Sequence, residues 1–130
     1  MSNRLTEVIQ DYRDKDHIRG DRDCNLMFLK VHEPHLYTKL HQQYTTIVGG
    51  VRAALKLLGV RSVHHFLVKN NYKPVQPSYQ LRGDIIVFEN SHNVYISLGS
   101  TWFGVRVDDS FGIINRYEYC ESTYNVFRKE

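Results

Sequence analysis

The order of hydrophobic patterns along the chain restricts its fold more than any single motif. Leu5, Val8, Ile9 and Tyr12 follow the i, i+3, i+4, i+7 spacing of an amphipathic helix. After residue 80 the apolar residues instead alternate or form short β-branched runs, which predict strands. Helices followed by an antiparallel sheet make an α+β fold. We expect one domain over residues 1–130, with 1–80 mainly helical, 81–130 mainly β, and the N-terminal helices packed on the sheet.

Capping residues divide the remainder of the first half into three further helices. Asp23 is a good N-cap for a helix that starts at Cys24, and Pro34 ends that helix after about His32. The other two are expected from Thr46 to Leu58, with Gly59 after its end, and after the cap residue Ser62, with Phe66 and Leu67 in its interior.

The second half predicts five strands separated by turns. Within the second of them, Val94, Ile96 and Leu98 fall on one face, while residues 93, 95 and 97 fall on the other. In the third, Trp102 belongs either to the core or to an exposed aromatic patch at a subunit contact. The predicted ranges are 84–88, 93–98, 101–107, 111–117 and 124–127.

Composition excludes several classes of function. The net charge is +3 and the basic residues are scattered, which is unlike a nucleic-acid-binding face. No apolar run approaches the roughly 18 residues of a membrane span. Cys24 and Cys120 form neither a disulfide framework nor a zinc-ligand pair, and the aspartates between Asp14 and Asp23 lack the spacing of a calcium loop. We therefore expect no nucleic-acid partner, no membrane span, no metal and no cofactor.

Cys24 is the residue most suggestive of chemistry. In the first turn of a helix, the macrodipole and the unpaired backbone N–H groups favour the thiolate, which is the nucleophilic form of cysteine. The alternative is a buried thiol that only packs, since cysteine is among the most buried residue types. Local sequence leaves both interpretations open.

Four segments bear on this choice: RDC at 22–24, YTTIVGGVRAALKLLG at 44–59, RGDIIVF at 82–88 and SHNVYISLG at 91–99. In this order they resemble the small NlpC/P60-like proteins of tailed bacteriophages, over about residues 17–115. That resemblance implies a papain-like fold, in which a helix carries the nucleophile and a strand carries the base. By the resemblance, Cys24 is the nucleophile.

The position of the catalytic base matches the family pattern less well than that of the nucleophile. Aligning Val94, Ile96 and Leu98 with the family pattern puts Asn93 at the position of the family histidine, and His92 one residue earlier. Because strand side chains alternate, this offset turns His92 to the opposite face unless a turn or bulge re-aims it.

The residue that orients the base in the family falls near Val105 here. Valine cannot accept an imidazole N–H, so only the neighbouring Asp108 and Asp109 could orient a histidine.

Two functions of different class follow from the resemblance. In the first, the protein is a cysteine hydrolase in which Cys24 and His92 cut a peptide amide bond, either in a peptidoglycan stem peptide or in a tail protein during processing. In the second, it is a catalytically silent structural or assembly component of the phage tail tip. The implied partners are other phage tail proteins, with peptidoglycan added by the first function. The implied location is the virion, and the host cytoplasm during assembly.

Overall fold

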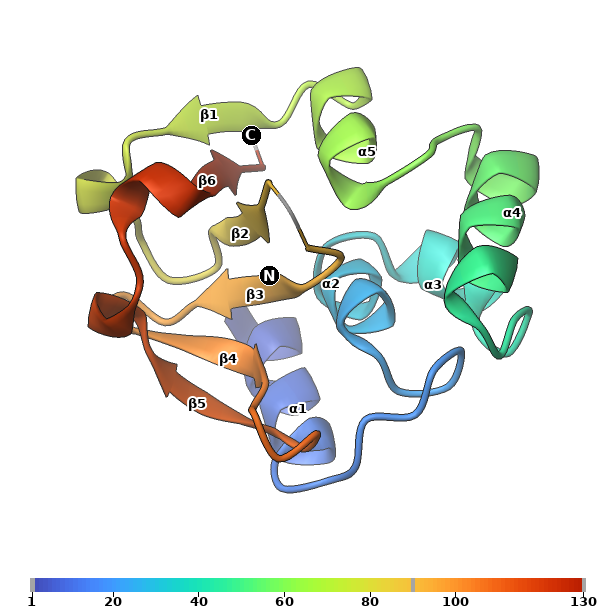
Figure 1. Cartoon of the computed structure of the whole chain (residues 1–130), viewed down its shortest axis with the longest axis horizontal. Helices are drawn as coiled ribbons and strands as arrows, with labels where there is room; N and C mark the ends of the chain where they lie inside the picture. Colours follow the sequence, from blue (N-terminus) through green and yellow to red (C-terminus); the bar gives the residue numbers. More distant parts are fainter. Residues whose placement is uncertain (1, 90, 130) are drawn as a thin grey trace.

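A computed structural model describes residues 2–89 and 91–129. Helices come first along the chain and strands follow, with short 3₁₀ turns between the later strands (Figure 1). The helices are α1 (Ser2–Tyr12), α2 (Cys24–His32), α3 (Pro34–Leu40), α4 (Ile47–Leu58) and α5 (Val63–Lys69). The strands are β1 (Lys73–Val75), β2 (Ile85–Phe88), β3 (Val94–Ser97), β4 (Thr101–Val105), β5 (Phe111–Asn115) and β6 (Tyr124–Arg128).

The strands form one antiparallel sheet in the order β1-β6-β2-β3-β4-β5. The last strand, β6, lies between β1 and β2, so the end of the chain lies inside the sheet. Helix α2 packs against β3 and β4, and α3 connects it in space to α4, which stands farthest from the sheet (Figure 1). The predicted α+β arrangement is therefore confirmed.

The sheet buries apolar side chains on both of its faces. Ile85 pairs with Ile96, which pairs with Phe103, and all three join the main core beneath α1 and α2. Ile86 pairs with Tyr95 in a second cluster on the opposite face. The predicted alternation along the second strand is confirmed, although Tyr95 and its face are buried too.

Trp102 is the centre of this second cluster and is fully buried. Tyr95 and Tyr119 stack on it with centroid distances of 5.7 and 5.3 Å, and its Nε1 donates a 2.8 Å hydrogen bond to Gln80. Tyr119 comes from the segment between two 3₁₀ turns, Arg116–Glu118 and Glu121–Thr123, which follow β5. Of the two roles open to Trp102, the structure assigns the core.

The predicted caps of α2 and α5 are confirmed, and Thr46, predicted as the start of its helix, is the cap of α4. Asp23, Thr46 and Ser62 each accept a hydrogen bond from a backbone N–H in the first turn of α2, α4 and α5. Gly59 ends α4 with a φ of 70°, the left-handed conformation that glycine adopts without a steric cost.

Two elements were not predicted, and the strands expected at 101–107 and 111–117 end earlier, at Val105 and Asn115. Pro34 ends α2 but also begins α3, because proline fits the first turn of a helix, where its missing N–H leaves no bond unmade. Strand β1 lies in the half expected to be helical, and only its pairing with β6 holds it in the sheet. Three residues that include Pro74 are too few to show a period-two pattern.

Candidate functional site

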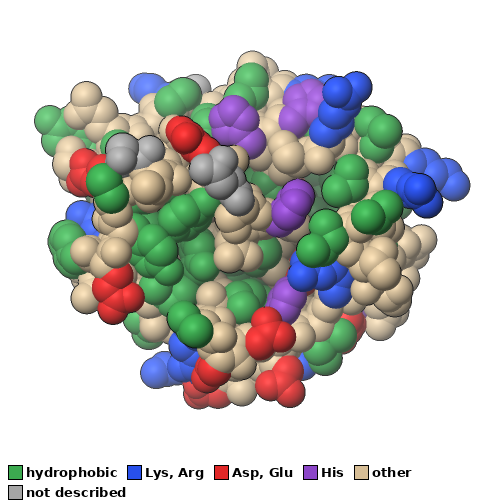
Figure 2. Space-filling view, in the orientation of Figure 1, with side chains coloured by type: hydrophobic (Ala, Val, Ile, Leu, Met, Phe, Trp, Pro, Cys, Tyr) green, Lys and Arg blue, Asp and Glu red, His purple; other side chains and the backbone are tan. Residues whose placement is uncertain are grey.

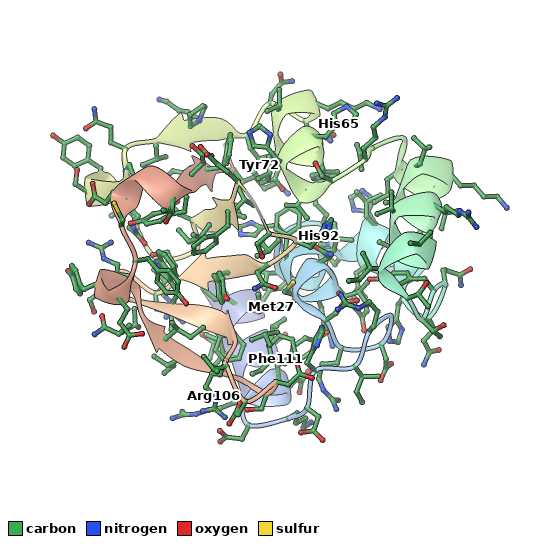
Figure 3. All side chains as sticks on the ribbon, viewed as in Figure 1. Met27, His65, Tyr72, His92, Arg106 and Phe111 are labelled. Carbon is green, nitrogen blue, oxygen red and sulfur yellow. The ribbon has the colours of Figure 1, made fainter. Side chains whose placement is uncertain are left out.

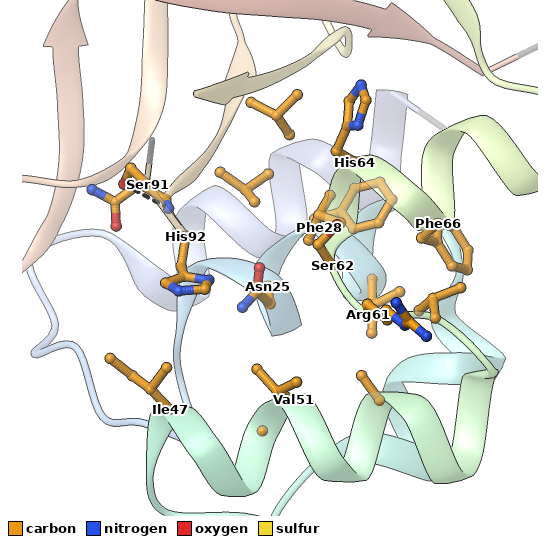
Figure 4. A pocket seen from close by; sticks show the side chains of 18 of the residues that line it. Asn25, Phe28, Ile47, Val51, Arg61, Ser62, His64, Phe66, Ser91 and His92 are labelled. Carbon is orange, nitrogen blue, oxygen red and sulfur yellow. Dashed lines mark hydrogen bonds between the residues drawn. The ribbon is translucent and has the colours of Figure 1, made fainter. Parts of the chain in front are cut away.

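A groove of about 760 Å³ separates α4 from the body of the molecule. One wall is the apolar side of α4, and the other is built by α2, α5 and the facing ends of β2 and β3 (Figure 4). In the space-filling view this face is hollowed beside a row of histidines, with hydrophobic side chains next to them (Figure 2). The groove opens next to the start of α2, where Cys24 lies.

Cys24 itself is sealed from the groove. Its side chain is 4% exposed, and the residues that line the groove include its neighbour Asn25 but not Cys24. The thiol donates a 3.5 Å hydrogen bond to the backbone carbonyl oxygen of His92. The sulfur therefore meets the main chain of the residue expected to be its base.

Burial raises the pKa of the Cys24 thiol to about 11, and the neighbouring Asp23 carboxylate adds to the rise. The backbone N–H of Val94 and the charge of Arg19 act in the opposite direction but are the smaller influences. The expected preference of a helix N-terminus for the thiolate is thus outweighed, because removal from water penalises the charged form more.

His92 and Asn93 both lie in the segment before β3, which begins at Val94. Both side chains are exposed and line the groove. The His92 ring extends into the groove near Asn25 and Ile47 (Figure 4). Among the described residues, no hydrogen bond joins that ring to the Cys24 sulfur. The sulfur instead contacts the backbone carbonyl of His92.

The candidate orienting carboxylates are engaged elsewhere. Asp108 accepts a 2.6 Å hydrogen bond from Ser110, and Asp109 lies 3.1 Å from the ring of His17. Both belong to the β4–β5 turn beside Arg106, which lies well away from His92 in Figure 3. Val105 is half-buried against the main core, as its apolar side chain requires.

Asp23 links the segments at the entrance of the groove through hydrogen bonds. Its fully buried carboxyl group accepts hydrogen bonds from the N–H of Gly20, the N–H of Leu26 and the hydroxyl of Tyr44. Gly20 has a φ of 84°, and a Cβ there would fall 1.7 Å from the Tyr44 carbonyl oxygen. This close approach connects the loop before α2 to the segment that leads into α4.

Within residues 2–89 and 91–129, no group of three or more His, Cys, Asp or Glu side chains is placed to hold a metal ion. In the same ranges, no helix is both long and apolar enough to cross a membrane.

Comparison with protein families gives a match that covers nearly the whole chain. Residues 1–126 match a family described as "Domain of unknown function (DUF6950)". The chain belongs to the DUF6950 family. No curated protein matches it. The description of the DUF6950 family states no activity.

Two polar residues that line the groove near Cys24 in this DUF6950 chain were not predicted from the sequence, Arg19 and Asn25. Arg19 lines the groove and is close enough to lower the Cys24 pKa, yet in sequence it is one charge of a polar loop. Asn25 lines the groove beside Cys24, and its buried Oδ1 has no hydrogen-bond partner among the described residues. An asparagine inside an apolar helix was the available signal.

Proposed function

We propose that this protein is a catalytically silent, NlpC/P60-like component of a bacteriophage tail that acts in tail assembly. Its partners are other tail proteins, and it works in the host cytoplasm during assembly and in the virion. The papain-like layout, in this proposal, is kept for its shape. In this proposal the groove beside α4 supplies a binding surface, and Cys24 only packs in the main core.

The proposal rests on the burial of the Cys24 thiol and on its raised pKa. A thiol with a pKa of about 11 is ionised in only about one molecule in 10,000 at pH 7. A cysteine nucleophile works as its thiolate, activated by a base within hydrogen-bond reach. Here the sulfur is buried, and its hydrogen-bond partner is a carbonyl, which cannot take its proton.

Genetic complementation tests the proposal. In a phage that encodes this protein and has lost its own copy, the wild type and Cys24→Ser should restore infectious particles equally. Cys24→Ala removes the donor to the His92 carbonyl, so a loss seen with Cys24→Ala but not with Cys24→Ser reports a packing role. Loss with both cysteine variants and with His92→Ala, in proteins that remain folded by circular dichroism, would overturn the proposal.

A cysteine hydrolase is the second candidate, and one contact favours it. The hydrogen bond between Cys24 and the His92 main chain places both residues where α2 begins and β3 is about to begin. If the exposed loop before β3 rearranged, the imidazole could take the proton of the thiol.

The chemistry of that candidate is simple to state. The sulfur bonds to the amide carbon, the imidazole transfers the thiol proton to the leaving amine as the C–N bond breaks, and water then hydrolyses the thioester. Backbone N–H groups in the first turn of α2 would hold the oxyanion.

Purified peptidoglycan and isolated tail proteins are the two substrates for its test. New amine ends released by the wild type, but not by Cys24→Ser or His92→Ala, would establish hydrolysis. Equal signals from all three proteins would remove this candidate.

A further inference from the structure

Helix α4 has no buried residue, although many of its side chains are apolar. Ile47, Val51, Ala54 and Leu58 follow a helical spacing and together face the groove. Ile47 and Val51 are 47% and 38% exposed. Ala54 and Leu58 pack partly against the main core, so the part of this apolar face that the protein leaves uncovered is at Ile47 and Val51.

The opposite wall of the groove is also apolar. Phe28 and Leu29 from α2, Phe66 from α5 and Val94 from β3 line it, and all four belong to the main core. Figure 4 shows Ile47 and Val51 on one side, with Phe28 and Phe66 across the open space. These four side chains are only 1–5% exposed, so the apolar area that the groove leaves open to water lies mainly on α4, at Ile47 and Val51. An apolar group that covers this area gains free energy.

The ends of the groove are polar and carry positive charge. Asn25 and His92 lie at the end beside the α2 N-terminus, and Arg61 and His64 lie toward the other end (Figure 4). Arg19 also lines the groove and is close enough to Cys24 to lower its pKa, so it belongs to the first end. Glu89 is the one acidic side chain among the described lining residues. The surface is thus complementary to an apolar segment with negative charge at its ends.

We propose that the groove binds an extended segment of a partner protein, in which consecutive apolar residues are flanked by acidic ones. An extended chain directs successive side chains to opposite sides, so one set of its apolar side chains can cover the α4 wall while the chain runs between the two charged ends of the groove. The volume of about 760 Å³ lies within the range of ligand pockets. The identity of the partner as a tail protein rests on the proposed function.

Fluorescence polarisation with three labelled peptides tests this inference. The first has the sequence Gly-Asp-Val-Leu-Val-Leu-Asp-Gly, the second replaces both aspartates with lysine, and the third replaces the four apolar residues with serine. The first peptide should bind with an affinity about ten times that of either of the others, or higher. This affinity should fall as the salt concentration is raised.

Matched variants locate the binding site. Arg19→Gln and Arg61→Gln should each weaken the acidic peptide about three- to tenfold, whereas Arg52→Gln, on α4 outside the groove, should have no effect. Val51→Asp should weaken it more than tenfold, while Val48→Asp, at an exposed α4 position outside the groove lining, should not. Each variant is first checked for folding by circular dichroism.

Three results would overturn the inference: equal or absent binding of all three peptides, equal effects of Val48→Asp and Val51→Asp, or self-association. In the last case size-exclusion chromatography would show a dimer of the wild type that Val51→Asp disrupts, so the occupant would be a second copy. These outcomes are independent of the complementation test. A required Cys24 with intact peptide binding contradicts only the silent role, and loss of peptide binding with a dispensable Cys24 contradicts only the groove.

Discussion

Arg128 at the end of β6 donates two hydrogen bonds, of 2.8 and 2.7 Å, to Asp84, the residue just before β2. The Asp84 carboxyl group is buried and also accepts the N–H of Leu81. Proximity to Asp84 raises the pKa of Arg128. This pair joins the last strand to the middle of the sheet, and it gives the Gly83-Asp84 motif a structural role.

The two halves of this pair should respond differently to mutation. Arg128→Met leaves a buried carboxylate without its counter-charge and should cost about 2–4 kcal/mol, reduced because Arg128 is partly exposed. Asp84→Asn keeps an acceptor for Leu81 and leaves an arginine that water can reach, so it should cost about 1–2 kcal/mol. Urea unfolding measures both, with Arg52→Met as the exposed control. Equal costs would show that the burial of Asp84 does not matter.

Cys24 should react slowly while the protein is folded. In a Cys120→Ser background, iodoacetamide at pH 8 should label Cys24 only after urea unfolding, since burial both shields the sulfur and raises its pKa to about 11. Cys120 is exposed and should label readily in a Cys24→Ala background. Mass spectrometry over time follows both reactions. Rapid labelling of native Cys24 with an apparent pKa below about 8.5 would instead support the hydrolase.

His32 should make the fold sensitive to mild acid. Its ring is buried between α2 and the sheet, its Nε2–H donates a 2.8 Å hydrogen bond to the Gly83 carbonyl oxygen, and burial lowers its pKa to about 4. Because that carbonyl oxygen can only accept, His32 Nε2 carries the proton. The unfolded chain takes up a proton near pH 6.5, so between pH 6.5 and 4 the unfolded state binds more protons than the folded state. Stability is therefore full above pH 6.5 and falls as the pH falls.

The size of this effect is measurable by urea unfolding at pH 7.5 and 5.0. The contribution of His32 to the loss at pH 5.0 should be about 2 kcal/mol. His32→Gln retains a donor for Gly83 without a titrating ring, so it should lose less stability between the two pH values. His35→Gln, at an exposed position, should behave as the wild type. An identical pH response in all three proteins would contradict the assignment.

Tyr44→Phe should loosen the groove entrance. The variant removes a 2.5 Å hydrogen bond to the buried Asp23 carboxyl group and should reduce the free energy of unfolding by about 1–3 kcal/mol. The local effect should be larger than the global one, with faster amide exchange at Gly20 and Leu26, whose N–H groups share the same carboxyl group. Tyr79→Phe, at an exposed tyrosine, is the control.

Much of the fold follows from local signals in the chain. Asp23, Thr46 and Ser62 start helices because each side chain satisfies an N–H that the helix leaves free, and this depends on a few neighbouring residues alone. The alternation of Val94, Tyr95 and Ile96 likewise reports a strand without knowledge of its partners.

The site could be predicted only in part, because its properties depend on contacts between distant segments. The sequence by itself determined that Cys24 begins a helix and that His92 precedes a strand, since caps and periodicity are local. Only the tertiary structure decided that the thiol is buried against the His92 carbonyl, that β6 enters the sheet beside β2, and that α4 faces the core across an open groove. Burial and ionisation depend on which remote segments exclude water, and local residue patterns do not encode that exclusion.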